Sequence, residues 1–438
     1  MGFCFRKMPV EELYEIFKRN PFLCTDSRKI VRNSIFFALK GNTFDGNTFA
    51  EIAIGDGCSY AVVDDPGVAR DRRFILVGNV LDALQQLAAL HRKHIGIPVL
   101  AITGTNGKTT TKELCSAVLS KQYRVVATKG NLNNHIGVPL TILSIHDDTE
   151  VAIVEMGANH PGEISHLCRI AQPRLGIITN IGRAHLEGFG SYDGIIHAKN
   201  ELYTYINDTG GTLFVNTDDE LLDSLSARIP RVTYGTAAPA SVMATCQSAD
   251  PYLTVSIALP GKRKERLVAT RLTGTYNLEN ILAAWTVGSY FHVPPGRMAE
   301  AISDYMPANM RSQILETSHN RVILDAYNAN PSSMEAALKN FADLSDPGKY
   351  LILGDMLELG SYSREEHQRI MGLAAELSLV KGILIGKQFS LLTIPDGFKA
   401  FLTVDEAREY LVKHPLTNRT ILLKGSRAIG LEQLTDLL

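Results

Sequence analysis

The sequence predicts an α/β protein of three domains, and three observations lead to that prediction. The chain has 438 residues, which is enough for about three domains of ordinary size. Hydrophobic residues make up 45% and charged residues 21%, a balance typical of folded proteins with buried cores. Strand-like apolar runs alternate with helix-like patterns along most of the chain, which favours largely parallel sheets covered by helices.

The first domain is predicted over residues 1–80 and is a small α/β unit. Its N-terminus has the pattern of an amphipathic helix, and short strand-like runs separated by turns follow. These runs are 34–41, 58–65 and 72–78. Asn79 then occupies the position expected of a helix N-cap, and 80–94 has the spacing of a helix with one buried face. We therefore place the first domain boundary near this helix.

The second domain is predicted over 81–307. Its strand-like runs are 99–103, 123–128, 150–156, 174–180 and 211–216. Because these runs are apolar on both faces and helical patterns separate them, they predict a largely parallel sheet. Between 231 and 273 the segments resemble alternating β-strands, with Pro260 and Gly261 at a hairpin turn. This part predicts a small antiparallel appendage, and a helical pattern follows at 277–291.

The third domain is predicted over 308–438 and repeats the alternation of strands and helices. The strand-like runs are 321–328, 350–355, 381–386 and 419–425, and the helical patterns are 333–344, 365–377 and 404–414. This order predicts a second doubly wound domain. Such domains bind ligands at the carboxyl ends of their strands.

Charge and cysteine usage exclude several classes of function. The formal net charge of −2 gives no overall attraction to nucleic acid or to a membrane surface. The sequence contains no apolar run of about 18 residues and no signal-peptide core, so we expect no membrane insertion. Its six cysteines include no CxxC pair, which argues against a cysteine metal site or a disulfide framework. We expect a cytoplasmic protein with reduced cysteines.

A glycine-rich loop at 104–109 is the strongest functional signal in the chain. Gly104 follows the apolar run 97–103, and Gly107 and Lys108 open a helical segment. Glycines let backbone N–H groups approach an anion, and a helix N-terminus adds partial positive charge. Lys108 can reach terminal phosphates and Thr109 can ligate Mg²⁺. The loop is shorter than an ordinary P-loop, which points to an ATP-dependent ligase; the alternative is an ordinary glycine turn between strand and helix.

Three further residues are candidates for the metal near this loop. Glu155 ends an apolar strand, where a carboxylate can hold Mg²⁺. His185 lies beside Glu187 in a polar, glycine-rich loop after the next strand, and a structural role is as well supported there as metal binding. Lys199 lies inside the helical pattern 192–205, and on that pattern alone it is a solvated lysine.

Amide and charged side chains define a second group of candidates. Asn277 and Asn280 share one helical face and could read adenine or the nearby backbone, with helix capping as the alternative for Asn277. Arg311 precedes the third domain. In that domain, polar clusters at the ends of three strands comprise Asp325, Tyr327, Asn328 and Asn330; Asp355 and Glu358; and Lys424, Ser426 and Arg427. Three such clusters predict a cleft at the carboxyl ends of the strands.

Several of these segments together resemble a known family. GTNGKTTTKE, NLNNHIGVP, EMGANHPGEI, NIGRAHLEGFGS and DAYNANPSSM are similar to motifs of the Mur ligases. TDSR at 25–28, with the following IFFALKGNTFDGNTF, resembles the N-terminal uridine-nucleotide domain of that family. The resemblance extends over essentially the whole chain.

The resemblance implies an ATP-dependent amide ligase that uses Mg²⁺ and has UDP-substrate, ATPase and Rossmann-like C-terminal domains. The motifs are closest to the branch that joins D-alanyl-D-alanine to UDP-N-acetylmuramoyl-tripeptide in peptidoglycan synthesis. In that reaction the tripeptide carboxylate attacks ATP to give an acyl phosphate, which the dipeptide amine converts to an amide through a tetrahedral intermediate. These small molecules are the expected partners, and we expect a monomer with hinges near 79–82 and 306–311.

The resemblance also implies a role for each matching residue. It assigns catalysis to Lys108, Lys199 and His185, and metal binding to Thr109, Glu155, His185 and Lys199, with Thr109 and Glu155 on one Mg²⁺ and His185 on a second. It assigns nucleotide binding to Gly104, Thr105, Asn106, Gly107, Lys108, Thr109, Thr110, Asn280, Arg311 and Asp325. It assigns binding of the other substrates to Ser27, Arg28, Asn134, Tyr327, Asn328, Asn330, Lys424 and Arg427. Lys199 falls on a lysine that many Mur ligases carbamylate, which converts a cation into a carboxylate-like ligand.

The chain departs from the family pattern at two positions. Leu324 stands where a second acid often precedes Asp325, and Met310 stands where a glycine commonly precedes the residue equivalent to Arg311. The sequence Asp-Asn-Pro-Arg, which selects meso-diaminopimelate in the preceding ligase of the pathway, is absent. The alternatives are another Mur-type ligase, such as a folylpolyglutamate synthetase, or a catalytically silent nucleotide-binding module. The short loop and the absence of Asn-Lys-x-Asp disfavour a GTPase.

Overall fold

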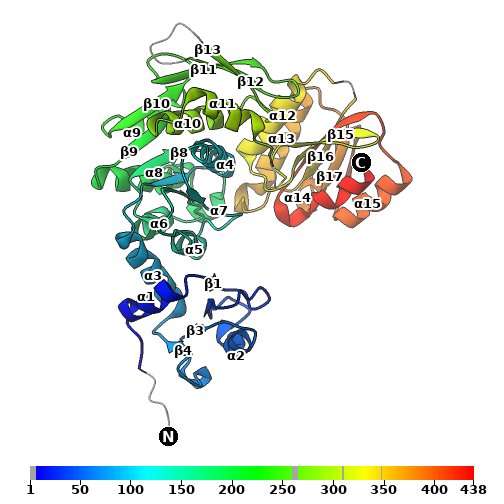
Figure 1. The fold of residues 1–438 in the computed structure, drawn as a ribbon. Coiled ribbons are helices and arrows are strands. Elements are labelled where there is room, and N and C mark those ends of the chain that lie inside the picture. The colour runs from blue at the N-terminus through cyan, green and yellow to red at the C-terminus, as the bar shows by residue number, and fades with distance from the viewer. Residues whose placement is uncertain (1–5, 259–264, 308–309, 347) are drawn as a thin grey trace.

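The computed structural model describes residues 6–258, 265–307, 310–346 and 348–438. It contains three separate sheets, one in each of three successive α/β domains, as predicted (Figure 1). The predicted turn at Pro260 and Gly261 lies outside the described residues. The boundaries at 80 and 307 remain a prediction.

The N-terminal domain has a parallel sheet of four short strands in the order β1-β2-β3-β4. The strands are β1 (Leu23–Cys24), β2 (Ile35–Phe37), β3 (Tyr60–Val63) and β4 (Phe74–Leu76), and the helices are α1 (Val10–Arg19) and α2 (Ala50–Gly55). The three predicted strands correspond to β2, β3 and β4. β1 was not predicted, because two residues are too few to form a pattern.

Helix α3 (Val80–His94) connects this domain to the next, and its prediction is confirmed. The Asn79 side chain accepts a hydrogen bond from the backbone N–H of Asp82 and so caps the helix. The buried face of α3 contacts α1 on one side and α5 and α6 of the central domain on the other. A continuous apolar core therefore runs from the N-terminal domain into the central one.

The central sheet has the strand order β13-β12-β11-β10-β9-β8-β5-β7-β6. Its strands are β5 (Val99–Thr103), β6 (Val125–Ala127), β7 (Val151–Glu155), β8 (Leu175–Ile178), β9 (Thr212–Asn216), β10 (Arg231–Gly235), β11 (Val242–Ser248), β12 (Thr254–Ala258) and β13 (Glu265–Ala269). The helices are α4 (Lys108–Leu119), α5 (Gly137–Leu143), α6 (Glu163–Ala171), α7 (Leu186–Phe189), α8 (Tyr192–Asp208), α9 (Glu220–Ser226), α10 (Asn277–Tyr290) and α11 (Pro295–Asp304).

Alternate residues of β5 serve the two faces of this sheet. Val99 and Ala101 pack into the core shared with α3, α5, α6 and α8, whereas Leu100 and Ile102 pack into the core shared with α4, α10 and α11. All five residues of β5 are buried. The prediction of a strand covered on both faces, made from a run that is apolar on both faces, is therefore confirmed for β5.

The antiparallel part of the sheet differs from the prediction. β10 pairs in parallel with β9 and β11, so it belongs to the parallel part rather than to the appendage. Only β11, β12 and β13 pair with one another in antiparallel fashion. β11 was not predicted because four of its seven residues are exposed and no apolar run marks it.

The C-terminal sheet has the order β14-β15-β19-β16-β17-β18, and only the edge strand β14 is antiparallel. The strands are β14 (Gln313–Glu316), β15 (Asn320–Asp325), β16 (Lys349–Gly354), β17 (Gly382–Ile385), β18 (Phe398–Phe401) and β19 (Arg419–Lys424). The helices are α12 (Pro331–Asp343), η3 (Gly360–Tyr362), α13 (Ser363–Glu376), α14 (Lys387–Ser390), α15 (Val404–Lys413), η4 (Arg427–Ile429) and η5 (Leu431–Leu437). β14 and β18 were not predicted.

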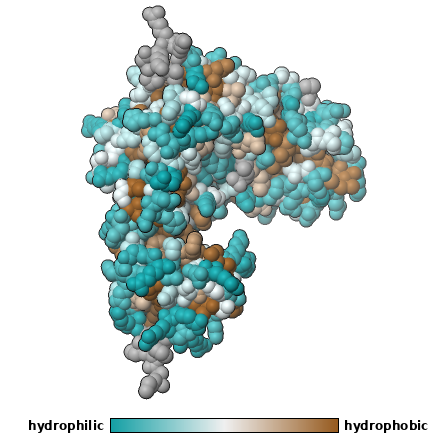
Figure 2. Space-filling view, viewed as in Figure 1, coloured by the Kyte–Doolittle hydropathy of each residue, from teal (hydrophilic) through white to brown (hydrophobic). Residues whose placement is uncertain are grey.

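The three domains are arranged so that the central and C-terminal domains meet while the N-terminal domain forms a separate lobe (Figure 1). Figure 2 shows a notch between that lobe and the C-terminal domain. Among the helices that the structure describes, none is both long and apolar enough to cross a membrane.

Candidate functional site

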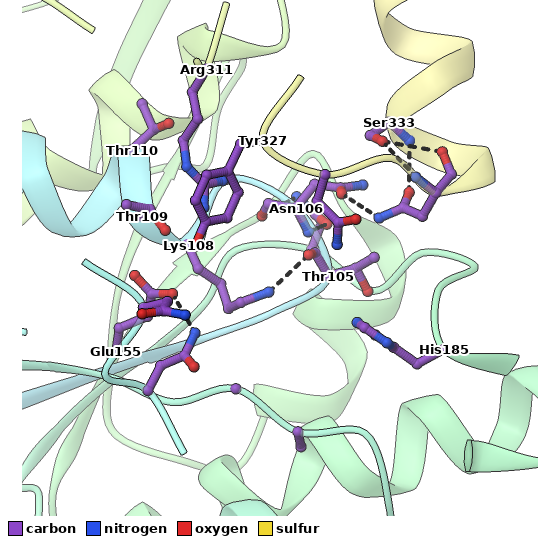
Figure 3. A pocket seen from close by; sticks show the side chains of 18 of the residues that line it. Thr105, Asn106, Lys108, Thr109, Thr110, Glu155, His185, Arg311, Tyr327 and Ser333 are labelled. Atoms are coloured by element: carbon purple, nitrogen blue, oxygen red, sulfur yellow. Dashed lines mark hydrogen bonds between the residues drawn. The ribbon is translucent and has the colours of Figure 1, made fainter. Parts of the chain in front are cut away.

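A cavity of about 910 Å³ lies between the central and C-terminal domains, at the carboxyl ends of β5, β7, β15 and β19. Sixteen of the residues predicted for the site line it: Thr105, Asn106, Gly107, Lys108, Thr109, Thr110, Asn134, Glu155, His185, Asn280, Arg311, Asp325, Tyr327, Asn328, Asn330 and Lys424. Figure 3 shows several of them converging from both domains. The structure thus brings together side chains that are up to 319 positions apart in sequence, from Thr105 to Lys424.

The glycine-rich loop lies between β5 and α4, next to β7 and β8. Gly104 and Gly107 have φ angles of 141° and 78°, which side chains rarely allow. A Cβ on Gly104 would lie 2.0 Å from Thr179 Oγ1, so the loop needs a glycine for space as well. β5 is flanked by β7 on one side and β8 on the other, so the strand order reverses at this point. Doubly wound sheets bind ligands at the carboxyl end of such a reversal.

Lys108 begins α4 and folds back over this loop. Its Nζ donates to the carbonyl oxygens of Gly104 at 2.7 Å and Thr105 at 2.9 Å. Burial lowers the pKa of Lys108 to about 8, although the nearby Glu155 carboxylate acts in the opposite direction. A bound anion at the loop would stabilise the ammonium form, since opposite charge at short range favours ionisation.

Glu155 ends β7 and faces the same cavity. One carboxylate oxygen accepts a hydrogen bond from Asn133 Nδ2 at 2.8 Å. The other, Oε2, is buried and has no hydrogen-bond partner among the residues that the structure describes. Because buried polar atoms are normally paired, this oxygen is suited to bind a cation or to accept a hydrogen bond from a ligand.

Lys199 corrects one interpretation of the sequence. The helical pattern alone suggested a solvated lysine, but the side chain is only 3% exposed. Its Nζ lies 5.5 Å from the centroid of the ring of Phe189, the last residue of α7. Burial, reinforced by the positive charge of Lys108, lowers the pKa of Lys199 to about 7. A substantial fraction of this amine is therefore neutral at neutral pH.

The two asparagines of α10 form a buried network beside the loop. Asn280 Nδ2 donates to Asn277 Oδ1 at 2.8 Å, and Thr111 Oγ1 donates to Asn280 Oδ1 at 2.9 Å. Asn277 donates to the carbonyl of Thr273 at 2.7 Å and does not cap the helix, whose N-cap is Tyr276. The capping alternative for Asn277 is therefore wrong.

The C-terminal domain contributes cationic and amide groups to the opposite wall. The Arg311 guanidinium stacks on the Tyr327 ring, with its Cζ 3.8 Å from the ring centroid, and its Nε is buried with no hydrogen-bond partner in the described part of the chain. Asn330 Nδ2 donates to Asn106 Oδ1 at 2.9 Å and so joins this domain directly to the glycine-rich loop. Lys424 Nζ forms an ion pair with Asp325 at 2.6 Å.

Not every predicted residue reaches the cavity. Ser27 and Arg28 lie in the N-terminal domain, where Arg28 is paired with Asp26 at 2.9 Å. Gly104, Lys199 and Arg427 are not among the residues that line the cavity, although the Arg427 guanidinium lies 5.1 Å from the centroid of the Tyr327 ring.

The polar cluster at the end of β16 does not form part of the cleft. Asp355 is buried, and its carboxylate accepts the backbone N–H groups of Gln388 and Phe389 at 2.8 and 3.0 Å. It therefore stabilises the start of α14 rather than a ligand. The first predicted cluster therefore lines the cavity, and the one at the end of β19 contributes only Lys424, since Ser426 and Arg427 are not among the lining residues. From the cluster at the end of β16, only Glu358 extends toward the cavity, by contacting His185.

Sequence reasoning missed several lining residues. Asn133 orients Glu155, and Asn180 accepts the backbone N–H of Asn106 at 3.0 Å. Both follow strands inside quoted motifs, a signal that could have identified them. Glu279 also lines the cavity, and burial raises its pKa to about 7; a glutamate in a helical pattern gives no such signal.

The cavity therefore combines an anion cradle with polar groups that find no partner within the described residues. Glu155 Oε2 requires a cation or a donor, and Arg311 Nε requires an acceptor. Among the described residues, no group of three or more His, Cys, Asp or Glu side chains forms a complete metal site. The arrangement suits a polyanionic ligand that arrives with a divalent cation, whose remaining ligands come from that anion and from hydroxyl oxygens.

All of the family models that match this chain are models of Mur ligase domains. Three family models match it: the Mur ligase family catalytic domain at 21–92, the Mur ligase middle domain at 102–288, and the Mur ligase glutamate ligase domain at 310–427.

Individual relatives match nearly the full length. The UDP-N-acetylmuramoyl-tripeptide–D-alanyl-D-alanine ligase of Bacillus subtilis is 34% identical and covers 94% of this chain and 92% of its own. The Escherichia coli enzyme of the same name is 31% identical, with coverages of 93% and 91%. A crystal structure of MurF from Acinetobacter baumannii is 32% identical, superimposes with a TM-score of 0.84, and covers 94% of this chain and 92% of its own.

Proposed function

Because this chain belongs to the Mur ligase family, we propose that it joins D-alanyl-D-alanine to UDP-N-acetylmuramoyl-tripeptide at the expense of ATP. The product is the UDP-N-acetylmuramoyl-pentapeptide of peptidoglycan synthesis. The observation that carries the proposal is the cavity, where a phosphate cradle faces cationic and amide groups from a second domain. We place the reaction in the cytoplasm and expect the protein to act as a monomer.

ATP would bind with its phosphates on the glycine-rich loop. Thr105 to Thr110, which line the cavity, would surround the phosphates, and Gly104 would give the loop the turn that this requires. Lys108 would neutralise the transferred group. The Asn280 amide would read the adenine, while Arg311 and Asp325 would bring the C-terminal domain onto the nucleotide. The Arg311 Nε that lacks a partner supports this assignment.

Mg²⁺ fits the residues around Glu155. Thr109 and Glu155 would hold one ion, His185 would hold a second, and Lys199 would serve as a further metal ligand. The Glu155 carboxylate oxygen that has no partner among the described residues supports the assignment. Lys199 would take part as a carbamate, and the depressed pKa of its buried amine favours that modification. When bound, the ion neutralises charge on the phosphates during transfer.

The other substrates would bind on either side of the nucleotide. Ser27 and Arg28 of the N-terminal domain would bind the uridine nucleotide, and Asn134 would contact the substrate near the cavity. Tyr327, Asn328, Asn330, Lys424 and Arg427 would shape the dipeptide end. Since no covalent enzyme intermediate is needed, positioning the reactants can supply about 7–11 kcal/mol of the barrier. Docking of the domains would also keep water from the acyl phosphate.

Phosphate release from ATP tests this function directly. We expect release only when UDP-N-acetylmuramoyl-tripeptide and D-alanyl-D-alanine are both present, together with a pentapeptide product detected by mass. The tripeptide carboxylate must be activated before the amine can attack, so omission of either substrate prevents turnover.

Different outcomes separate the alternatives. Turnover with a single amino acid as the acceptor would indicate a sibling ligase. Binding of ATP without turnover under any of these conditions would indicate a catalytically silent module.

A further inference from the structure

The side chain of His185 is contacted by a carboxylate from the other domain. His185 lines the cavity from the central domain, and Figure 3 shows its ring pointing toward the cavity. Its Nδ1 lies against a carboxylate oxygen of Glu358, which belongs to the C-terminal domain. The contact lacks regular hydrogen-bond geometry, and within the described chain Nδ1 has no other hydrogen-bond partner.

Both residues of this contact have an uncommon backbone conformation. His185 has a φ angle of 51° and Glu358 one of 62°, in the left-handed region that few residues other than glycine adopt. Such conformations persist where the surrounding structure enforces them, and they cluster at functional sites. Here two of them, from different domains, direct side chains at each other.

The loop that carries Glu358 is held by its own domain. The backbone N–H of Leu357 donates to Ser426 Oγ at 3.0 Å, and that of Met356 donates to the buried His367 Nε2 at 3.0 Å. Leu359 is buried on the other side of Glu358. The position of the Glu358 carboxylate therefore follows the position of the C-terminal domain.

The loop that carries His185 packs against the same region. Helix α7, which starts directly after His185, contacts η3 of the C-terminal domain. On the same loop, the backbone N–H of Arg183 donates to Ser332 Oγ at 2.9 Å. The guanidinium of Arg183 forms an ion pair with Glu366 at 3.3 Å. The His185–Glu358 contact is thus one of several between this loop and the C-terminal domain, and it differs from those in involving a residue that lines the cavity.

We propose that Glu358 is a positioning residue that orients His185 for the metal ion. A histidine that binds a metal through one nitrogen usually donates its other N–H to a carboxylate or carbonyl, which fixes the tautomer and the ring. Glu358 takes the Nδ1 side and leaves Nε2 for the ion in the cavity. Since the carboxylate belongs to the C-terminal domain, docking of that domain completes the metal site. The proposal rests on the function proposed above.

Binding of Mn²⁺ in the presence of the non-hydrolysable nucleotide AMPPCP tests this proposal. Electron paramagnetic resonance measures free Mn²⁺, and the component of binding that His185→Ala removes defines the site. We expect Glu358→Ala to weaken that component about 10- to 100-fold. Glu358→Gln, which keeps an acceptor oxygen, should weaken it less. Glu358 is 57% exposed at its side chain, so these variants should fold, which thermal unfolding checks.

Arg183→Ala is the matched control, because it removes an interdomain ion pair on the same loop without touching His185. We expect it to leave Mn²⁺ affinity within about twofold of the wild type, and Glu358→Ala to have no further effect in a His185→Ala background. Equal losses of Mn²⁺ affinity in Glu358→Ala and Arg183→Ala, or an unchanged affinity in Glu358→Ala, would overturn the role of Glu358 while leaving His185 as a metal ligand. A wild type without any His185-dependent component would overturn the metal assignment as well.

Discussion

Replacement of Lys108 by alanine is expected to lower kcat by about 10²- to 10³-fold, the usual cost of removing a group that stabilises transition-state charge. Lys108 begins α4 directly above the phosphate cradle and bonds only to carbonyl oxygens of its own loop within the described residues. Its removal should therefore leave the fold intact while the transferred phosphoryl group loses its nearest cation. Acceptor-dependent phosphate release measures the effect.

Lys93→Ala is the matched control for this prediction. Lys93 is an exposed lysine on α3, and it is not among the lining residues of the cavity. Its replacement should leave kcat within about twofold of the wild type, as for surface sites in general. If Lys108→Ala retained more than a tenth of the activity with an unchanged melting temperature, the assignment of the loop as the catalytic phosphate site would be wrong.

Replacement of Lys199 by alanine is expected to lower activity by at least about 100-fold, and formate or acetate should restore part of it. Burial lowers the pKa of Lys199 to about 7, so a neutral amine is available at neutral pH. The amine lone pair can attack the carbon of CO₂, forming an N–C bond and releasing one proton. The resulting carbamate would supply carboxylate-like oxygens close enough to interact with Lys108 of the glycine-rich loop, and a small acid can take its place.

Lys199→Arg separates the carbamate from a plain cation. Arginine keeps the positive charge but does not form this carbamate, so the variant should be as inactive as Lys199→Ala. The melting temperatures of both variants must be compared, because the site is 3% exposed and a larger side chain can strain it. Full activity of Lys199→Arg, or no recovery of Lys199→Ala with any small carboxylate, would contradict the carbamate.

The sequence predicted those parts of the fold whose local signals agree with their burial. Helix α3 was predicted with its bounds, because Asn79 supplies a cap and one apolar stripe faces α1 and α5. β5 was predicted because its residues form an apolar run, and the structure shows all of them buried, as that run requires. β18 was missed because its residues are intermediate or exposed and contain a lysine. An edge strand of this kind is determined by its neighbour β17 rather than by its own pattern.

Within the site, the sequence predicted the residue types but not the direction of every side chain. Lys199 was interpreted as solvated because a helical pattern does not tell which polar residue of the helix is buried. Asp355 was assigned to the cleft because it ends a strand, yet two backbone N–H groups of α14 occupy its carboxylate. The contact of His185 with Glu358 depends on how two domains meet, and no local pattern contains that information.

The most direct test of the central claim follows oxygen during the reaction. The terminal carboxylate of UDP-N-acetylmuramoyl-tripeptide is labelled with ¹⁸O, and the phosphate released with D-alanyl-D-alanine and ATP is analysed by mass. If the carboxylate attacks the γ-phosphorus, one labelled oxygen passes into each phosphate while the other stays in the new amide. We expect one ¹⁸O per phosphate and a pentapeptide of matching amount. Phosphate without label would mean that the peptide carboxylate is not activated by ATP, and it would contradict the account.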